Sequence, residues 1–422
     1  MLDASLAEVD PELAELVEGE RRRQLGTLDL VASENVPPRA VLDAQGSVLT
    51  AKYADGYPGD RHYDLCEWVD GVETLAIERA KSLFGAEHAN VQPYSGSSAN
   101  MAVLDALCEP GGTVLGWDFE HGGHPTQYLS GTFAGRHYRT ASYGVRRDDR
   151  LVDMDQVASL VEQLRPKVVF AGWSCYSRWL DFRLFRQICD SVGSYLVVDM
   201  AHFAGLVAAG EHPDPVPYAD ACTMTVHKTL GGARGGTIIC REDLAERVDA
   251  AVFPGTQGCP LPHVIAAKAV TFLLAASDAF RERIARTVEG ARAIAAVLVE
   301  AEGRTASPVV TAGTDVHQLT VDLGPSGRLA GDVWARLNRV GISANAMRIA
   351  YDVAEAPAGS GLRFGAAALA TRGLDAADFS EVGDILADVL DGSFDSAGAA
   401  SEKALARRVQ ALLERFPIYR YR

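Results

Sequence analysis

An alternation of short β-rich runs with helical patterns, between residues 91 and 240, most constrains what this chain can fold into. The helical patterns Met154–Leu164 and Phe182–Val192 each lie between two such runs. This alternation is typical of a mainly parallel sheet with helices on both faces. Only a short turn-like gap separates the last two runs, so we expect one antiparallel strand there. The β-rich runs are Val114–Trp117, Val168–Trp173, Tyr195–Met200, Cys222–Val226 and Thr237–Cys240.

The first 27 residues are expected to form an N-terminal arm (residues 1–27) that packs on something else. Asp10 can cap a helix, and Pro11 suits the first helical position. Three arginines at 21–23 and Gly26 suit the end of that helix.

Two domains are expected after the arm, a large one at residues 28–280 and a smaller C-terminal α+β domain at residues 281–422. The character of the chain changes at Ala276–Glu302, a long Ala- and Arg-rich helical pattern. Later patterns predict strands near Val316–Leu323 and Leu362–Phe364, and helices near Ala330–Val340, Phe379–Leu390 and Glu402–Phe416.

Composition argues against several classes of protein. Hydrophobic residues are 48% of the 422, enough for large cores and too many for wholesale disorder. With 40 Lys and Arg against 56 Asp and Glu, the net charge of −16 argues against nucleic-acid binding. Neither a signal peptide nor an apolar run of about 18 residues is present, so no membrane span is expected. The seven cysteines are scattered without a C-x-x-C pair, so we expect a cytoplasmic protein without a disulfide framework.

A loop of small residues precedes a helical run that ends near Cys108. The loop reads Tyr94-Ser95-Gly96-Ser97-Ser98-Ala99-Asn100. Backbone N–H groups and the helix dipole at such a helix start bind anions, and three serine hydroxyls add donors. An ordinary helix cap has the same composition, so the loop alone leaves both interpretations open.

Two charged residues follow apolar strands. Asp199 ends one of them, where open α/β sheets bind ligands, and it could pair with a protonated ring nitrogen, ligate a metal or be structural. Lys228 precedes the glycine-rich run 231–236. A lysine forms Schiff bases once burial or nearby cations lower its pKa, although a phosphate-binding lysine or a surface turn would have the same sequence.

Two histidines flank a glycine pair in His121-Gly122-Gly123-His124. They could ligate a metal, or one imidazole could stack on an aromatic cofactor. Because no third ligand is obvious nearby, we predict no metal site.

These features fit together as the site of a pyridoxal-phosphate enzyme. An anion loop, Asp199 and, 29 residues later, Lys228 would all lie at strand ends of one sheet. In such enzymes a lysine bonds the cofactor and an aspartate pairs its pyridinium nitrogen. The alternative phosphate motifs, the P-loop and G-x-G-x-x-G, are absent.

The chain resembles serine hydroxymethyltransferases of the fold-type-I pyridoxal-phosphate class, from about Leu28 to Tyr419. The resemblance implies an α/β fold with a mainly parallel seven-stranded sheet, a homodimer or tetramer, and small-molecule substrates. The stretches that carry it are Val31–Asn35, Lys52–Gly59, Asn90–Ser97, His121–His124, Val198–His202, His227–Leu230 and Ser360–Gly365.

The resemblance also implies roles for single residues. Lys228 would form the Schiff base, Asp199 would hold the pyridine nitrogen, and His124 would stack on the ring. Arg363 and Ser33 would bind the substrate carboxylate, which a planar guanidinium matches. The other residues around the cofactor would be Gly96, Ser97, Ser174, His202 and Thr225.

A second group would reach the site across a dimer interface. It comprises Tyr53, Asp55, Tyr63 and Gly258. Of all these residues, the resemblance places Lys228, Asp55, Tyr63, His202 and His124 in catalysis.

Departures from the family gather where folate would bind. Asp55 stands where the family usually has Glu, and Met347 stands where an Asn contacts the pterin. The other departures are His62, Pro125 and Gln127, together with Cys259, which stands in a second phosphate loop where the family usually has Gly. The residues for the cofactor and for the amino-acid carboxylate are intact.

The pattern of departures therefore predicts pyridoxal-phosphate-dependent aldol and retro-aldol transfer at glycine Cα without folate. The predicted enzyme resembles an L-threonine transaldolase of specialised metabolism. It would take threonine or serine and a second aldehyde, and a use of tetrahydrofolate is doubtful. The alternative is a serine or α-methylserine hydroxymethyltransferase that uses tetrahydrofolate. Transamination, decarboxylation and a non-catalytic protein are further alternatives.

Overall fold

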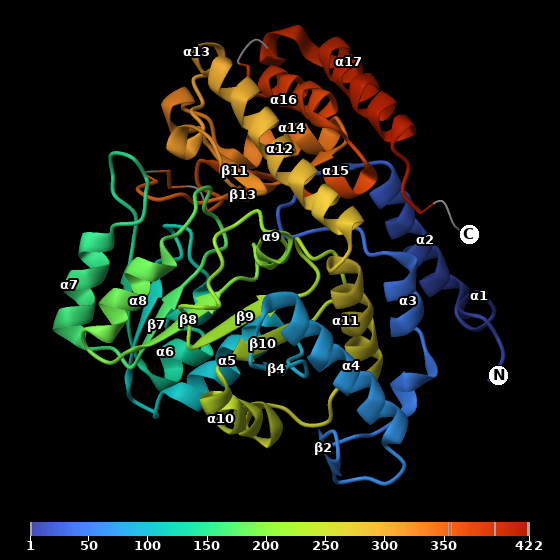
Figure 1. Cartoon of the computed structure of the whole chain (residues 1–422). Helices are drawn as coiled ribbons and strands as arrows, with labels where there is room; N and C mark the ends of the chain where they lie inside the picture. The colour runs from blue at the N-terminus through green and yellow to red at the C-terminus, as the bar shows by residue number, and fades with distance from the viewer. Residues whose placement is uncertain (1, 353, 356, 392–393, 420–422) are drawn as a thin grey trace.

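The computed structural model describes residues 2–352, 354–355, 357–391 and 394–419. Residues 1 and 420–422, at the ends of the expected arm and small domain, lie outside this description. A large body around the main sheet fills the lower part of Figure 1, and a smaller body with the C-terminal helices lies above it. The expected domain boundaries at 27/28 and 280/281 stay a prediction.

The main sheet has seven strands in the order β4-β10-β9-β8-β7-β5-β6. Neighbours from β9 to β6 are parallel, whereas β10 runs antiparallel to both β9 and β4. The fold class and the antiparallel strand expected from the sequence are thereby confirmed. The strands are β4 (His88–Asn90), β5 (Thr113–Trp117), β6 (Arg139–Tyr143), β7 (Val168–Ala171), β8 (Tyr195–Asp199), β9 (Ala221–Thr225) and β10 (Gly236–Cys240).

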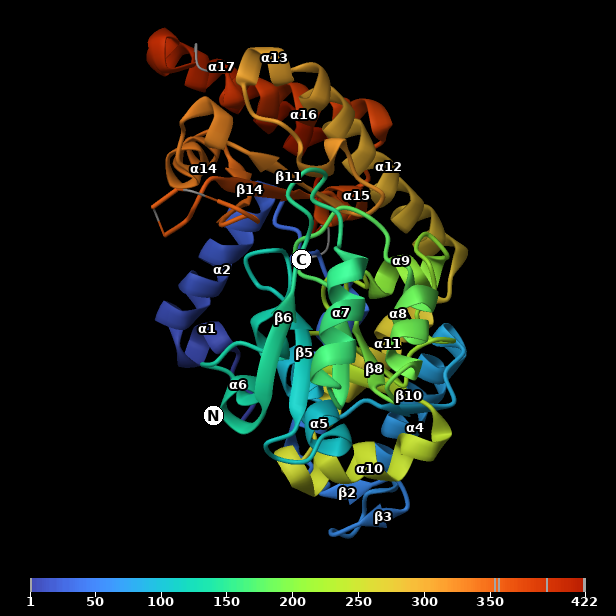
Figure 2. The same cartoon turned by 90° about the vertical axis from the view of Figure 1, so that its left-hand side faces the viewer.

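Both faces of this sheet are buried, since alternate residues of one strand enter different cores. Val169 and Ala171 of β7 pack in one core, and Val168 and Phe170 pack in the other. Figure 2 shows helices on either side of the sheet. The first core includes α4 (Glu67–Phe84), α7 (Met154–Leu164), α8 (Phe182–Asp190) and α11 (Pro262–Ala275); the second includes α5 (Gly96–Leu107) and α10 (Ala245–Ala250).

The smaller body has its own core around a three-stranded antiparallel sheet, β11-β14-β13. Its elements are β11 (Gln318–Asp322), β13 (Asn345–Met347), β14 (Gly361–Gly365), α12 (Asp278–Glu300), α14 (Ala330–Arg339), α15 (Ala367–Arg372), α16 (Ala376–Leu390) and α17 (Phe394–Arg415). Leu28 and Leu30 pack in this core, because β1 (Leu28–Asp29) pairs with β12 (Ile342–Ser343). The chain after the arm therefore lies against the C-terminal body.

The arm consists of α1 (Leu6–Val9) and α2 (Pro11–Leu25). The Asp10 carboxylate accepts from the Leu13 N–H at 2.9 Å, and the helix ends at Gly26, as expected. No residue of α2 is buried, and its apolar side chains are exposed, for example Leu16 at 66% and Val17 at 56%. The arm lies along the right-hand edge of Figure 1.

Helices α11 and α12 connect the two bodies. Ser277 caps α12 by accepting from the Phe280 N–H at 3.3 Å. None of the helices in the described ranges is by itself long and apolar enough to cross a membrane. The pair α11 and α12 meets that criterion only jointly, by length and composition, and is bent by 81°.

Candidate active site

The candidate site lies where the parallel strands β7, β8 and β9 end. Asp199 is the last residue of β8, and Lys228 lies in the turn after β9. The main chain is tightly packed here: a Cβ on Gly172, whose φ is +107°, would lie 2.1 Å from the Asp199 carbonyl oxygen. The carboxyl edge of an open α/β sheet is where such folds bind ligands.

Asp199 is 5% exposed and is held by neutral donors. One carboxylate oxygen accepts from the Asn100 amide at 2.9 Å and the other from the Ala201 N–H at 3.2 Å. The Asn100 side chain is fixed in turn, because its oxygen accepts from the Thr223 hydroxyl at 2.6 Å. Within the described ranges no cation forms an ion pair with Asp199. The carboxylate is therefore oriented and available to a cationic ligand group.

Lys228 is half-buried, and its amine lies close enough to Asp199 for the two charges to interact. The pKa of Lys228 is lowered to about 8, mainly by burial and also by the guanidinium groups of Arg363 and Arg234, while the Asp199 charge opposes this shift. The Lys228 carbonyl accepts from the Asn35 amide and the Gly231 N–H, both at 2.9 Å. A lysine with such a pKa has a far larger neutral fraction at neutral pH than an ordinary lysine, and a nucleophilic amine needs this neutral form.

His124 joins the same network through Thr126. The His124 Nδ1 and the Thr126 hydroxyl are 2.6 Å apart, and that hydroxyl also accepts from Asn100 at 3.0 Å. Burial lowers the pKa of His124. The Asp199 charge raises this pKa and the Lys228 charge lowers it, and the ring is neutral as a result. His121 points elsewhere, since its Nδ1 accepts from the Val145 N–H at 3.1 Å. Among the described residues no group of three or more His, Cys, Asp or Glu could hold a metal.

Three stacked rings lie behind Lys228. Trp173 and His202 have ring centroids 5.9 Å apart, and His202 and His317 have theirs 5.6 Å apart. His202 Nδ1 is 3.4 Å from His317 Nε2. Burial, and then the nearby Lys228 and Arg363, lower the pKa of His202 well below its usual value, and burial lowers that of His317 to about 3. Both imidazoles are therefore neutral hydrogen-bonding groups.

The Ser95–Ser98 loop begins α5. The Ser95 hydroxyl accepts from the Ser98 N–H at 3.1 Å, and the Ser98 hydroxyl accepts from the Ser95 N–H at 2.8 Å. Ser95 and Ser98 therefore cap the helix, whereas Ser97 is exposed and its hydroxyl makes no hydrogen bond within the described part of the chain. A Cβ on Gly96 would lie 2.8 Å from Thr225 Cγ2, so the loop packs directly on β9.

Arg363, on β14, reaches the site from the smaller body. Its guanidinium donates to the Ser174 carbonyl at 2.7 Å and to the Asn345 side-chain oxygen at 2.8 Å. Burial lowers the pKa of Arg363. Across the described ranges no carboxylate forms an ion pair with it. A half-buried guanidinium bonded only to neutral oxygens could bind a ligand carboxylate.

A second group lies apart from Lys228, with Tyr53, Asp55 and Tyr63 on the segment before α4 and Gly258 on the segment before α11. The rings of Tyr53 and Tyr63 are 5.0 Å apart, and the two residues are 54% and 46% exposed. Asp55 has one buried carboxylate oxygen without a hydrogen-bond partner. Gly258 is exposed, and no atom lies within 4 Å of the position of an added Cβ. Within the described ranges no hydrogen bond joins this group to Lys228, Asp199 or His124.

Comparison with known proteins gives one consistent result. The family model for serine hydroxymethyltransferase matches residues 6–386. A serine hydroxymethyltransferase of Nocardia farcinica is 52% identical over 419 residues, which is 98% of this chain and 95% of that relative. Those of Leifsonia xyli and Clavibacter sepedonicus are 53% and 52% identical, over 99% of this chain and 96% and 97% of theirs.

The chain belongs to the serine hydroxymethyltransferase family. It is a pyridoxal-phosphate-dependent transferase with a fold-type-I architecture. Enzymes of this family are generally oligomeric and act on small molecules.

The site of this serine hydroxymethyltransferase homologue fits pyridoxal phosphate. Lys228 offers an amine of lowered pKa, and Asp199 offers a carboxylate free of ion pairs. The first turn of α5 starts at Gly96 and offers an anion site, because Ser97 is exposed and its hydroxyl makes no hydrogen bond in the described part of the chain. Each polar part of the cofactor would thus meet a group of matching chemistry.

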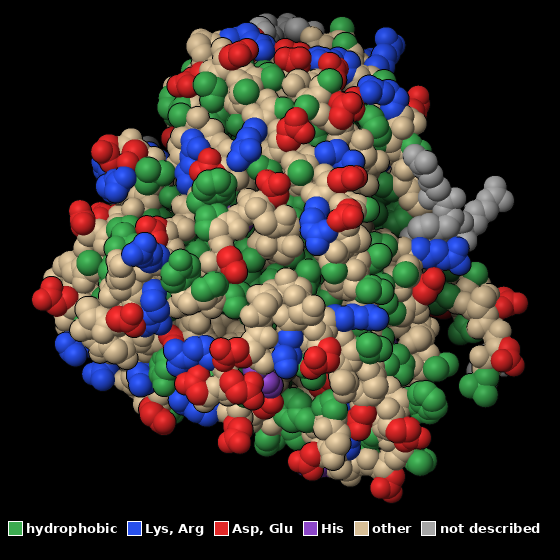
Figure 3. All heavy atoms as spheres, viewed as in Figure 1, with side chains coloured by type: hydrophobic (Ala, Val, Ile, Leu, Met, Phe, Trp, Pro, Cys, Tyr) green, Lys and Arg blue, Asp and Glu red, His purple; other side chains and the backbone are tan. Residues whose placement is uncertain are grey.

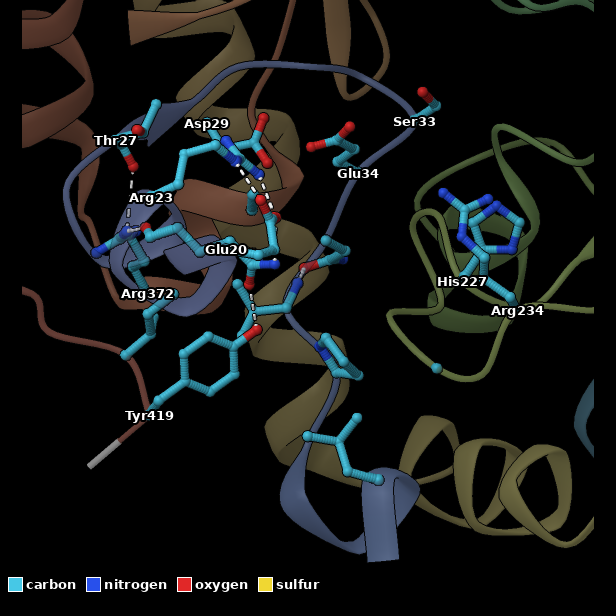
Figure 4. A pocket seen from close by; sticks show the side chains of 18 residues that line it. Glu20, Arg23, Thr27, Asp29, Ser33, Glu34, His227, Arg234, Arg372 and Tyr419 are labelled. Carbon is cyan, nitrogen blue, oxygen red and sulfur yellow. Dashed lines mark hydrogen bonds and ion pairs between the residues drawn. The ribbon is translucent and has the colours of Figure 1, made fainter. Parts of the chain in front are cut away.

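A cavity of about 350 Å³ adjoins the site on the side of the arm (Figure 4). Ser33 lies on one wall, and His227 and Arg234 lie on the facing loop. Burial raises the pKa of Asp29, which faces Glu34, to about 7. Ser33 lines this cavity, and in the described part of the chain no hydrogen bond joins it to Lys228.

The structure brings together many of the residues singled out from the sequence and leaves others apart. Those gathered at the strand ends are Gly96, His124, Ser174, Asp199, His202, Thr225, Lys228 and Arg363. Those left apart are Tyr53, Asp55, Tyr63 and Gly258. Sequence reasoning missed Asn100 and His317; Asn100 closes the anion-loop motif, but no local signal marks His317.

Proposed function

We propose that this protein is a serine hydroxymethyltransferase that moves the hydroxymethyl carbon of serine to tetrahydrofolate and releases glycine. The observation that carries the proposal is Arg363, a half-buried guanidinium without a carboxylate partner in the described ranges, near the lowered-pKa amine of Lys228. Together they match the carboxylate and the Cα amino group of one amino acid. Relatives that are 51–53% identical over at least 95% of their length bear this name, which supports the choice of reaction.

The residues around Lys228 have complementary roles in this proposal. Lys228 would hold the cofactor covalently, Asp199 would keep its ring nitrogen protonated, and His124 would cover the ring. The N–H groups of Gly96 and Ser97, with the Ser97 hydroxyl, would hold the phosphate. Thr225, Ser174 and His202 would lie at the ring edge. When bound, the cofactor supplies an electron sink for bond breaking at Cα.

Arg363 and Ser33 orient the amino acid by its carboxylate, so that the bond to be broken is held in one geometry. His202 remains neutral because its pKa lies well below the usual value as a result of burial. It can therefore accept or donate a hydrogen bond beside the reacting atoms without adding a second positive charge to that of Arg363.

The Asp55 group completes the site of a partner subunit in this proposal, so the active unit is a homodimer or a tetramer. Large apolar side chains surround the group at the surface, with Leu65 81% and Trp68 80% exposed. Apolar side chains also gather along the right-hand edge of Figure 3, where the arm and α4 lie. Asp55 and Tyr63 would then exchange protons with a substrate held by the other chain.

A second candidate is the folate-independent transaldolase, which transfers the glycine unit of threonine to an aldehyde in specialised metabolism. It is favoured by Met347, which lies on β13 opposite Gly361 and lines a cavity of about 40 Å³ with Cys175 and Arg348. A thioether cannot make the hydrogen bonds of a side-chain amide. The comparisons favour the hydroxymethyltransferase and give no support to the doubt about tetrahydrofolate.

The deciding experiment is glycine formation by the holoenzyme from serine and from threonine, each with and without tetrahydrofolate. The proposal expects glycine from serine to depend on folate. If threonine and an added aldehyde release glycine at a rate that does not depend on folate, the second candidate would replace the proposed function. Met347→Asn is a matched variant, because restoring the amide should lower the KM for folate if a pterin binds here.

A further inference from the structure

Lys268 of α11 is a buried cation that the proposed chemistry does not use. It is 1% exposed. Its Nζ donates to the carbonyl oxygens of Val91 at 2.6 Å, Pro93 at 3.0 Å and Gly236 at 2.7 Å. An ammonium has three donors, so the three carbonyls use all of them and none remains for a ligand.

The three carbonyls belong to two segments that meet beneath the Ser95–Ser98 loop. Val91 and Pro93 lead from β4 into the loop, and Gly236 begins β10. The Gly236 N–H donates to the Pro93 carbonyl at 3.0 Å. Because a Cβ on Gly236 would lie 2.2 Å from the Ser95 carbonyl oxygen, these segments are in direct contact with the loop.

The same side chain packs on the glycine run that follows Lys228. A Cβ on Gly235 would lie 2.4 Å from Lys268 Cε, so a side chain would not fit there. The Gly235 carbonyl accepts from the Val226 N–H at 3.1 Å, two residues before Lys228. Lys268 therefore contacts the segment that leads from β4 into the Ser95–Ser98 loop and the glycine run that leads into β10.

This arrangement requires the charged form of the amine. A neutral amine has two N–H donors, and its lone pair would face the third carbonyl. Burial lowers the pKa of Lys268 to about 7, and the Glu73 carboxylate opposes this. Three oxygen acceptors also favour the ammonium, and each of these charge-assisted bonds is stronger than a neutral one.

We propose that Lys268 is a positioning residue for the cofactor. Its ammonium joins the carbonyls of Val91, Pro93 and Gly236 and so holds the N–H groups of Gly96 and Ser97 in the geometry that binds the phosphate. This inference rests on the proposed assignment of the Ser95–Ser98 loop to the cofactor phosphate.

The test is the affinity of the apoenzyme for pyridoxal phosphate, measured by absorbance titration without any substrate. Lys268→Met removes the charge and all three donors at similar length. We expect binding to weaken by about tenfold or more, since three charge-assisted hydrogen bonds are lost beneath the loop. The ³¹P resonance of the bound phosphate should also shift, because its N–H donors move.

Thr271→Val is the matched control. Thr271 is 2% exposed on the same helix, and its hydroxyl donates only within the helix, to the Ala267 carbonyl at 2.7 Å. Its affinity for the cofactor should stay within about twofold of the parent, because an intrahelical bond contributes to stability alone. The unfolding midpoint of each apoenzyme is measured in parallel. If Lys268→Met does not fold, Lys268→Gln, which keeps two donors, carries the same measurement.

A lower unfolding midpoint with unchanged cofactor affinity and ³¹P resonance would overturn the proposal, since that is the signature of a structural role. Ser97→Ala reports separately on the loop. If Ser97→Ala weakens binding and the Lys268 variants do not, only the positioning role of Lys268 is wrong. If Ser97→Ala leaves affinity unchanged, the loop assignment is wrong and the Lys268 proposal falls with it. Neither result changes the choice between folate and aldehyde, because no substrate is present.

Discussion

The two halves of the candidate site differ in how completely one chain builds them. Around Lys228, buried polar groups hold one another: Asn100 donates to Asp199 at 2.9 Å and to Thr126 at 3.0 Å. Around Asp55, one carboxylate oxygen has no hydrogen-bond partner, and Tyr53 and Tyr63 are about half exposed. A buried polar atom without a partner is costly. The proposal that a second copy of the chain completes the Asp55 half would account for this difference, although Trp173, His227 and His317 near Lys228 also have a buried nitrogen without a partner in the described ranges.

The largest effect is expected from Lys228→Ala. This change removes the nucleophilic amine from the half of the site around Lys228. Turnover should therefore fall by roughly 10³-fold or more, as it does when other enzymes lose their nucleophile. Borohydride treatment followed by mass spectrometry should find no covalently attached cofactor. Attachment at another lysine would contradict the assignment.

Asp199→Asn should have the next largest effect. The amide keeps the size of the carboxylate but not its charge, so turnover should fall by roughly 10²-fold, the usual effect of losing one preorganised electrostatic group. Turnover at saturating cofactor separates this loss from weaker cofactor binding. An activity near that of the parent would show that Asp199 does not pair with the ring.

Mixing two inactive variants tests the comparison between the halves directly. A dimer of one Lys228→Ala chain and one Asp55→Ala chain contains one site in which Lys228 and Asp55 are both intact, if the halves come from different chains. Random mixing should then restore about a quarter of the parental activity. Half of the dimers contain one chain of each variant, and each of these mixed dimers has one intact site out of two. No recovery, with exchange verified by mass spectrometry, would place both residues in one site of one chain.

The smallest expected effect is on pH dependence. Because burial lowers the pKa of Lys228 to about 8, its neutral, nucleophilic fraction rises with pH up to and just above that value. The rate at which apoenzyme binds pyridoxal phosphate should therefore rise about tenfold from pH 7 to pH 9 and then level off. Arg234→Gln should move this midpoint upward, since Arg234 lowers the pKa of Lys228. A flat profile would show that Lys228 is already neutral at pH 7.

The strands of the main sheet show how far local pattern could predict the fold. The buried strands β7, β8 and β9 were found because parallel strands covered on both faces are continuous apolar runs. β6 was missed, since Arg139–Tyr143 is an edge strand with only one buried residue. β4 was missed because it has only three residues. The helix α4 was also missed, although Gly85, in the left-handed conformation, marks its end.

The residues of the candidate site also divide into those that a local motif predicted and those that only a contact between distant parts of the chain brings in. Lys228, Asp199 and the Ser95–Ser98 loop were predicted because each is a local motif at the end of a strand. His317 was not predicted, since it meets His202 only through a contact 115 residues away in the sequence. The preference for a folate-independent reaction gave much weight to Met347 and Asp55, and similarity over the whole chain favours the folate-dependent alternative instead.

The sequence by itself determined the type of fold and the chemistry of the cofactor site, because strand periodicity, helix caps and short motifs depend on neighbouring residues. Tertiary structure alone decided which groups became buried partners. Lys268 meets the Val91 carbonyl across 177 residues of sequence, and Arg363 meets the Ser174 carbonyl across 189. Burial removes the water that would otherwise satisfy such groups, so their pKa values and hydrogen bonds depend on what the folded chain places beside them.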